Sequence, residues 1–146
     1  MNITLKALSG TFQVARWKPA AITQLWSQLL PLTEPKQDPS LFSLNVTSTE
    51  TSLVCSTSLT LPSAGPESPV AIESGYAAFV VEGTLDFALV GILAAITSSL
   101  AEAKISVFAV STYDTDYILV KEDKLAGAIE AWTRSNVQGV AIRVVS

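Results

Sequence analysis

The sequence predicts an α+β protein whose C-terminal half follows the order βαββαβ. From Tyr76 onward, short runs with strand character alternate with two segments whose apolar residues recur at helical spacing. All seven prolines lie before Val70, and the stretches 31–39 and 62–69, rich in Pro, Ser and Glu, are expected to be loops. The order βαββαβ predicts an antiparallel sheet of four strands with two helices on one face, the ferredoxin-like arrangement.

The C-terminal half carries the clearest pattern. Its first helix has Leu89, Leu93, Ile96 and Leu100 at spacings of four, three and four, which places them on one face. The second helix has Leu125, Ile129 and Trp132 on one face. The expected elements are a strand over Tyr76–Glu82, a helix from Phe87 to about Ala103 with Asp86 as N-cap, strands over Ile105–Val110 and Tyr117–Lys121, a helix from Asp123 to about Thr133, and a strand over Gly139–Val145.

The N-terminal half predicts the order ββαββ, a reduced version of the same unit packed beside the complete one. Its expected elements are strands over Ile3–Leu8 and Phe12–Trp17, a helix over Ala20–Leu30 entered through Pro19, and strands over Leu41–Val46 and Ser52–Cys55. We therefore expect an N-terminal unit over 1–61, a linker over 62–74 and a complete domain over 75–146.

Composition narrows the function classes. Hydrophobic residues make up 49% of the chain and charged residues 15%, so a partner chain is expected to cover part of the surface, and we expect a homodimer. The net charge of −4 and the absence of a basic cluster exclude a nucleic-acid partner. The longest nearly apolar run, 87–96, is about half of the roughly 20 residues that a membrane span needs.

The chain has no histidine and a single cysteine, Cys55. This excludes intramolecular disulfides, zinc sites of the usual kind and histidine-based catalysis, so we expect no metal, no cofactor and no catalytic residue of those types. Cys55 reads as a buried strand residue rather than a reactive thiol. The alternating start Met1–Lys6 lacks the layout of a secretory signal, which predicts a cytoplasmic protein.

Two stretches carry a family resemblance. They are V81-E-G-T-L-D-F-A-L-V-G-I-L93 and I105-S-V-F-A-V-S-T-Y-D-T-D-Y-I-L-V-K121. Both resemble the ACT domains of small stand-alone tandem-ACT proteins, the group related to the cytosolic arginine sensor CASTOR. The resemblance implies a regulatory fold that binds an amino acid or similar small molecule at an interface between ACT units. Relatives commonly have Pro, Ser and Thr where this chain has Thr84, Ala88 and Val90.

The resemblance also implies the ligand-binding residues. The loop after the first strand gives Leu85, Asp86 and Phe87, with Gly91 facing the pocket from the first turns of the helix. The second stretch gives the turn residues Thr112, Tyr113, Asp114 and Asp116.

The chemistry of these residues fits an amino acid, although each has a plainer reading. Exposed amides at a helix start suit a carboxylate, and Asp116 or Asp114 suits an ammonium or guanidinium group. Gly91 could equally allow close packing of helix and strand, both aspartates could satisfy turn amides, and Asp86 is better explained as a helix cap. Tyr113 either covers an aliphatic ligand portion or lies at an interface. A cation on Asp114 and Asp116 has little support.

Three functions remain open. The first is a non-catalytic sensor that passes ligand occupancy on through a dimer or a protein partner. The second is a small enzyme, an isomerase or cyclase, in which Asp86, Asp114 or Asp116 acts with Tyr113 as acid and base. The third is an adaptor with a vestigial pocket.

The turn 111–116 contains no glycine, which predicts a wider turn than a tight hairpin of the primed type.

Overall fold

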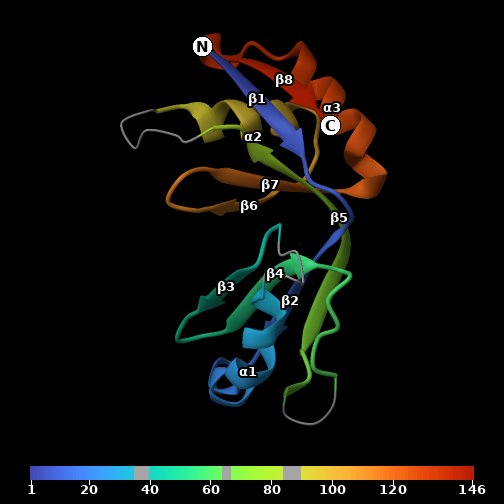
Figure 1. Ribbon diagram of the computed structural model, residues 1–146. Helices are drawn as coiled ribbons and strands as arrows, with labels where there is room; N and C mark the ends of the chain where they lie inside the picture. The colour runs from blue at the N-terminus through green and yellow to red at the C-terminus, as the bar shows by residue number, and fades with distance from the viewer. Residues whose placement is uncertain (35–39, 64–66, 84–89) are drawn as a thin grey trace. The chain divides into compact units, whose positions relative to one another are not determined.

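The computed structural model of the chain describes residues 1–34, 40–63, 67–83 and 90–146 (Figure 1). Three predicted site residues, Leu85, Asp86 and Phe87, lie outside the described residues. The strands are β1 (Asn2–Ala7), β2 (Phe12–Trp17), β3 (Ser43–Val46), β4 (Thr51–Ser56), β5 (Ala71–Val81), β6 (Phe108–Ser111), β7 (Asp116–Lys121) and β8 (Ala141–Val145). The α-helices are α1 (Ile22–Leu29), α2 (Ile92–Glu102) and α3 (Leu125–Arg134).

The chain forms two compact units. The large unit contains Met1–Ser9 and Tyr76–Ser146, and the small unit contains Gly10–Gly75. The first nine residues cluster with the C-terminal half, and Ala71–Gly75 belong to strand β5. The division into an ACT-like unit over 1–61, a linker over 62–74 and an ACT domain over 75–146 stays a prediction.

The large unit has the predicted order βαββαβ, from β5 to β8, with one additional strand. Strand β1 lies between β8 and β5, so the sheet order is β8-β1-β5-β7-β6. Leu5 stands opposite Val81 in the antiparallel pair with β5 and opposite Val144 in the parallel pair with β8. Among the described residues, the part of the sheet in the large unit is therefore mixed and has five strands, where four antiparallel strands were expected.

The core of the large unit lies between the sheet and helices α2 and α3. Alternate strand residues such as Ile3, Leu5 and Ile118 turn their side chains toward the helices. From the helices, Ile96 and Trp132 fill the space between, and both are fully buried. This confirms two helices on one face. Other members of the cluster are Phe79, Val81, Ile92, Ala95, Leu100, Val120, Ala128, Val140 and Ile142.

The small unit has the strand order β3-β4-β2-β5. Helix α1 shares its core with these strands. Its sequence of elements, β2-α1-β3-β4-β5, is the ferredoxin-like order with the second helix absent: among the described residues no α-helix lies between β4 and β5. Prolines at 62, 66 and 69 disfavour a helix there. Leu59 and Leu61 in this connection are buried in the core around Trp17, Leu25 and Leu53.

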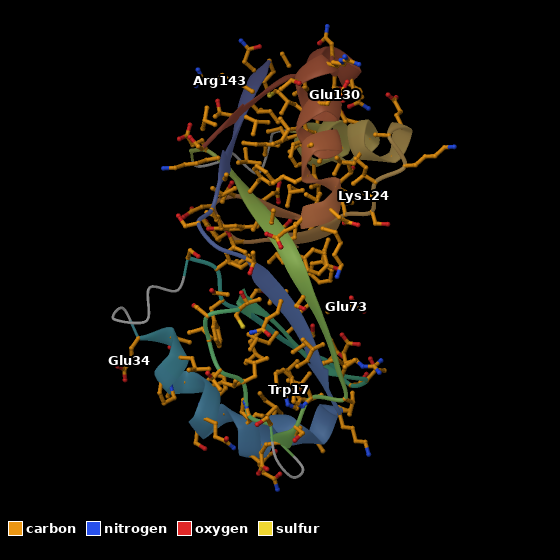
Figure 2. The ribbon with its side chains drawn as sticks, turned by 90° about the vertical axis from the view of Figure 1, so that its right-hand side faces the viewer. Trp17, Glu34, Glu73, Lys124, Glu130 and Arg143 are labelled. Atoms are coloured by element: carbon orange, nitrogen blue, oxygen red, sulfur yellow. The ribbon has the colours of Figure 1, made fainter. Side chains whose placement is uncertain are left out.

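Side-chain hydrogen bonds fix this connection to β2. Gln13, buried in β2, donates through Nε2 to the carbonyl oxygens of Ser56 at 3.1 Å and Leu59 at 3.3 Å. Trp17, in the interior of the small unit (Figure 2), donates through Nε1 to the Glu67 carbonyl oxygen at 2.5 Å. Two side chains of β2 therefore hold the backbone of this connection at Leu59 and at Glu67.

Cys55 is a buried residue of β4, as the sequence predicts, and its side chain packs in the core of the small unit. Burial raises the pKa of the Cys55 thiol to about 11, while the hydrogen bond from Gln13 acts in the opposite direction. The thiolate is the reactive form, so a neutral buried thiol supports a structural role.

A pH dependence of stability follows from this thiol. Because the folded pKa is above the unfolded value, its contribution is complete below about pH 9 and is lost as the pH rises through 11. We expect the free energy of unfolding of the wild type, relative to Cys55→Ala, to be constant below pH 9 and to fall by on the order of 2 kcal/mol by pH 11. Urea titrations of both proteins across this range measure the difference, and a flat difference would contradict the prediction.

Candidate functional site

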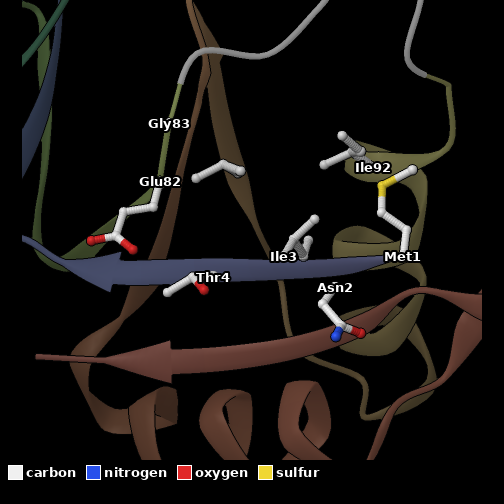
Figure 3. Close-up of a pocket in the computed structure, with 8 residues that line it drawn as sticks. Met1, Asn2, Ile3, Thr4, Glu82, Gly83 and Ile92 are labelled. Atoms are coloured by element: carbon white, nitrogen blue, oxygen red, sulfur yellow. The ribbon is translucent and has the colours of Figure 1, made fainter.

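A cavity opens in the large unit where β1, the end of β5 and the start of α2 meet (Figure 3). Its volume is about 530 Å³, which lies within the usual range of small-molecule sites. All of its lining residues belong to the large unit: Met1, Asn2, Ile3, Thr4, Val81, Glu82, Gly83 and Ile92.

The strand register sorts the lining into an apolar and a polar part. Ile3, Val81 and Ile92 are buried and belong to the core beneath α2. Thr4 follows Ile3 in β1, so its side chain turns to the sheet face without helices. Glu82 directly follows Val81, the last residue of β5. Thr4 and Glu82 are neighbours, since the Glu82 amide donates to the Thr4 carbonyl oxygen at 2.9 Å. The cavity thus offers an apolar wall and a polar rim that includes a carboxylate.

A second hollow of about 440 Å³ lies beside the first, along β1 and β8. It shares Asn2, Ile3 and Thr4 with the first cavity and adds Ala141, Ile142 and Arg143. Arg143 stands opposite Thr4 in the parallel pair. Glu82, directly after β5, Thr4 of β1 and Arg143 of β8 therefore follow one another across the chain segments, and we call these three residues the polar row.

The polar row presents opposite charges on the two sides of a hydroxyl group. Adjacent strands lie about 4.8 Å apart, so the α-carbons of Glu82 and Arg143 are separated by roughly 10 Å. Both side chains are exposed, and neither forms a hydrogen bond or ion pair with any residue that the structure describes. A ligand with an ammonium and a carboxylate group can meet both charges from a position over Thr4.

The start of helix α2 differs from the prediction. The helix begins at Ile92, five residues later than expected, with Gly91 as its N-cap residue. Gly91 has a φ of 85°, outside the helical region, and Val90 before it is also non-helical. Helix α2 therefore does not extend back through Gly91 and Val90 as expected, and its N-cap residue is Gly91. The predicted start at Phe87 and the predicted cap Asp86 lie outside the described residues.

Gly91 is favoured at its position by its backbone conformation. A residue with a side chain rarely adopts its positive φ. A Cβ atom there would stand 2.9 Å from Oε1 of Gln138, in the turn before β8. Gly91 neighbours Ile92 of the cavity wall but does not itself line the cavity.

The predicted turn residues form the β6–β7 hairpin. Thr112 and Thr115 close the turn: the Thr112 amide donates to the Thr115 carbonyl oxygen at 2.8 Å, and the Thr112 hydroxyl donates to the same oxygen at 3.1 Å. Tyr113 and Asp114, between them, are exposed and have negative φ. A primed turn needs positive φ, so the turn is not of the primed type, as predicted. It is not the wider turn that was expected, because only Tyr113 and Asp114 lie between Thr112 and Thr115.

This turn is attached to the cavity through one contact. The Thr115 hydroxyl donates to the carbonyl oxygen of Val81, a cavity residue, at 2.6 Å. The carboxylate of Asp116 accepts a hydrogen bond from the Ser111 hydroxyl at 2.5 Å. Thr112, Tyr113, Asp114 and Asp116 do not line the cavity, so the structure does not gather the predicted residues around one described pocket.

Sequence reasoning missed the residues that line the cavity. The alternation of polar and apolar residues in Asn2-Ile3-Thr4-Leu5-Lys6 predicted a strand. This alternation does not indicate that the strand pairs with β5 and β8. Arg143 was missed for the same reason. Glu82 was assigned only as the end of a strand.

Acid–base chemistry and metal binding gain no support from the described part of the chain. A general acid and base must reach the same substrate, and neither Asp114 nor Asp116 lines either hollow. Within residues 1–34, 40–63, 67–83 and 90–146, no group of three or more His, Cys, Asp and Glu side chains is placed to hold a metal ion. No described helix has the length and apolarity needed to cross a membrane.

Comparison with known proteins supports the fold. The ACT domain family model matches residues 71–134, which extend from β5 to the end of α3. No curated protein matches the sequence.

Solved structures resemble the whole chain. Protein Atu0741 of Agobacterium tumefaciens is 23% identical, with a TM-score of 0.72 over 100% of this chain and 96% of that one. Protein VC0802 of Vibrio cholerae, described as of unknown function and a possible transport protein, is 24% identical, with a TM-score of 0.58 over 87% and 84%. The ligand-free regulatory subunit of aspartate kinase from Thermus thermophilus is 8% identical, with a TM-score of 0.58 over 84% and 90%.

Identities at this level show the fold alone, and the narrower relation to the CASTOR group stays a prediction. The family match lies in the half where the sequence carries the resemblance, and the similar structures extend over both halves. The chain is an α+β protein with an ACT domain around residues 71–134 and an ACT-like N-terminal half.

Proposed function

We propose that this is a non-catalytic regulatory protein of the ACT type that binds an amino acid or a similar metabolite. The observation that carries the proposal is the cavity at the start of α2, with the polar row along its rim. The similarity in fold to a regulatory subunit of aspartate kinase supports a regulatory role. The proposal includes a homodimer in the cytoplasm, with the ligand at an interface between ACT units.

The polar row fits the two charges that all amino acids share. Arg143 carries a guanidinium group that can bind a carboxylate through two parallel hydrogen bonds. Glu82 can accept from an ammonium group, and the Thr4 hydroxyl between them can donate or accept. The loop residues Leu85, Asp86 and Phe87 with Gly91, and the turn residues Thr112, Tyr113, Asp114 and Asp116, remain proposed contacts.

A thermal-shift screen with the twenty amino acids and common acidic metabolites tests this proposal. We expect at least one compound to raise the melting temperature, because a ligand at 100 times its dissociation constant stabilises the folded state by about 2.7 kcal/mol. Glu82→Gln and Arg143→Gln are each expected to weaken binding of that compound by about tenfold or more, because each variant loses a charge-assisted hydrogen bond.

The matched controls are substitutions in α2 and directly before α3. Glu102→Gln and Lys124→Gln neutralise the same charges at exposed positions outside both hollows and should leave binding unchanged. A screen in which no compound raises the melting temperature would contradict the proposed function. A stabiliser that binds equally to Glu82→Gln and Arg143→Gln would exclude the polar row as its site.

A further inference from the structure

A third charged side chain lies beside the polar row. Lys6 follows Thr4 by two positions in β1, and the residues that alternate with them, Ile3 and Leu5, are buried in the core between the sheet and the helices. The exposed Lys6 side chain therefore turns to the same sheet face as Thr4. A strand advances about 3.3 Å per residue, so the α-carbons of Lys6 and Thr4 are roughly 6–7 Å apart.

Arg143 supplies a second cation on this face. It stands opposite Thr4 in the parallel pair of β1 and β8, and its strand neighbours Ile142 and Val144 contact the core on the other face. With adjacent strands about 4.8 Å apart, the α-carbons of Arg143 and Lys6 lie roughly 8 Å apart on the diagonal. Both side chains are long and flexible, so both cations can reach one small molecule placed over Thr4.

These two cations have no acidic neighbour on their own strands. Neither β1 nor β8 contains Asp or Glu. Within the residues that the structure describes, neither Lys6 nor Arg143 forms an ion pair or a side-chain hydrogen bond. Glu82, on the other side of Thr4, adds one negative charge. The group therefore carries two positive charges and one negative charge, although the chain as a whole has a net charge of −4.

We infer that the polar row, extended by Lys6, binds an acidic amino acid such as aspartate or glutamate. The inference rests on the proposed function and adds the chemical class of the ligand. Such a molecule has one ammonium group and two carboxylates, the reverse of the charges that the protein presents. Glu82 accepts from the ammonium group, Arg143 binds one carboxylate through two parallel hydrogen bonds, and Lys6 binds the other. A neutral amino acid leaves Lys6 without a counter-charge, and a basic one brings a second cation beside it.

Isothermal titration calorimetry with two matched pairs of probes tests this inference: L-aspartate against L-asparagine, and L-glutamate against L-glutamine. Each amide has the size, the ammonium group and the α-carboxylate of its acid and lacks only the second negative charge. We expect the wild type to bind at least one acid about fivefold or more tightly than its amide, because the amide loses a charge-assisted hydrogen bond to Lys6.

Substitutions at Lys6 test its role in this preference. In Lys6→Gln the affinity for the acid should fall to about that for the amide, while the affinity for the amide stays unchanged. Lys6→Arg keeps the charge and should retain most of the preference. The matched control is Lys124→Gln, which removes the same charge at an exposed position directly before α3 and should retain all of it. Lys6 is exposed, so circular dichroism should show folded variants.

The outcomes separate this inference from the proposed function. A wild type that binds neither acid more tightly than its amide overturns the inference alone, and a stabiliser found in the thermal-shift screen still upholds the proposed function. A Lys6→Gln variant that keeps the preference, or that loses acid and amide binding equally, also overturns the inference, because Lys6 then does not contact the second carboxylate. If no compound of the screen binds, the inference fails together with the proposed function.

Discussion

Replacing Trp132 by alanine is expected to lower the free energy of unfolding by about 3–5 kcal/mol. The side chain is fully buried and joins three elements of the large unit. Its ring meets that of Phe79 in β5 edge to face, with centroids 5.0 Å apart. Its Nε1 donates to the Ile96 carbonyl oxygen of α2 at 3.2 Å. Alanine would leave a cavity between both helices and the sheet.

Chemical denaturation of Trp132→Ala and Trp132→Phe measures the two parts of this contribution. Phenylalanine keeps an aromatic contact with Phe79 and loses the hydrogen bond, so we expect a smaller loss of about 1–2 kcal/mol. Arg134→Ala is the control, because it removes only an exposed ion pair with Glu130 and should cost less than about 1 kcal/mol. A loss below about 1 kcal/mol for Trp132→Ala would contradict the packing described here.

Local patterns predicted most elements of the fold. The spacing of Ile96 and Leu100 identified α2, and the spacing of Ile129 and Trp132 identified α3, because a helix buries one face and its period is therefore visible in the sequence. Strand β2 was predicted with its observed bounds from the run Phe12–Trp17. These predictions needed only residues that are close together in the chain.

Two kinds of feature did not follow from local patterns. The first is strand pairing: Leu5 lies opposite Val81 and Val144, and no spacing within 2–7 specifies partners so distant in sequence. The second is the start of α2. The apolar run predicted an earlier start, but Gly91 has a positive φ and the helix begins only at Ile92. The cavity depends on both features, which explains why the polar row was not predicted.

Because β1 lies inside the sheet, a substitution at Leu5 is also expected to lower the free energy of unfolding strongly. This residue is fully buried between β5 and β8 and belongs to the core of the large unit. We expect Leu5→Ala to lower the free energy of unfolding by about 2–5 kcal/mol. Val46→Ala, at an exposed position of β3, is the control and should change stability by less than about 0.5 kcal/mol.

Hydrogen exchange distinguishes the two possible assignments of β1. If β1 completes the sheet of the large unit, Leu5→Ala should speed exchange of the β5 and β8 amides around Val81 and Val144, because those strands hydrogen-bond to β1. Had β1 belonged to a separate N-terminal unit over 1–61, the loss of protection would centre instead on β2 and β4. Accelerated exchange confined to Phe12–Trp17 and Thr51–Ser56 would therefore contradict the observed sheet order. The same variant should weaken binding at the cavity, since Ile3 and Thr4 of this strand line it.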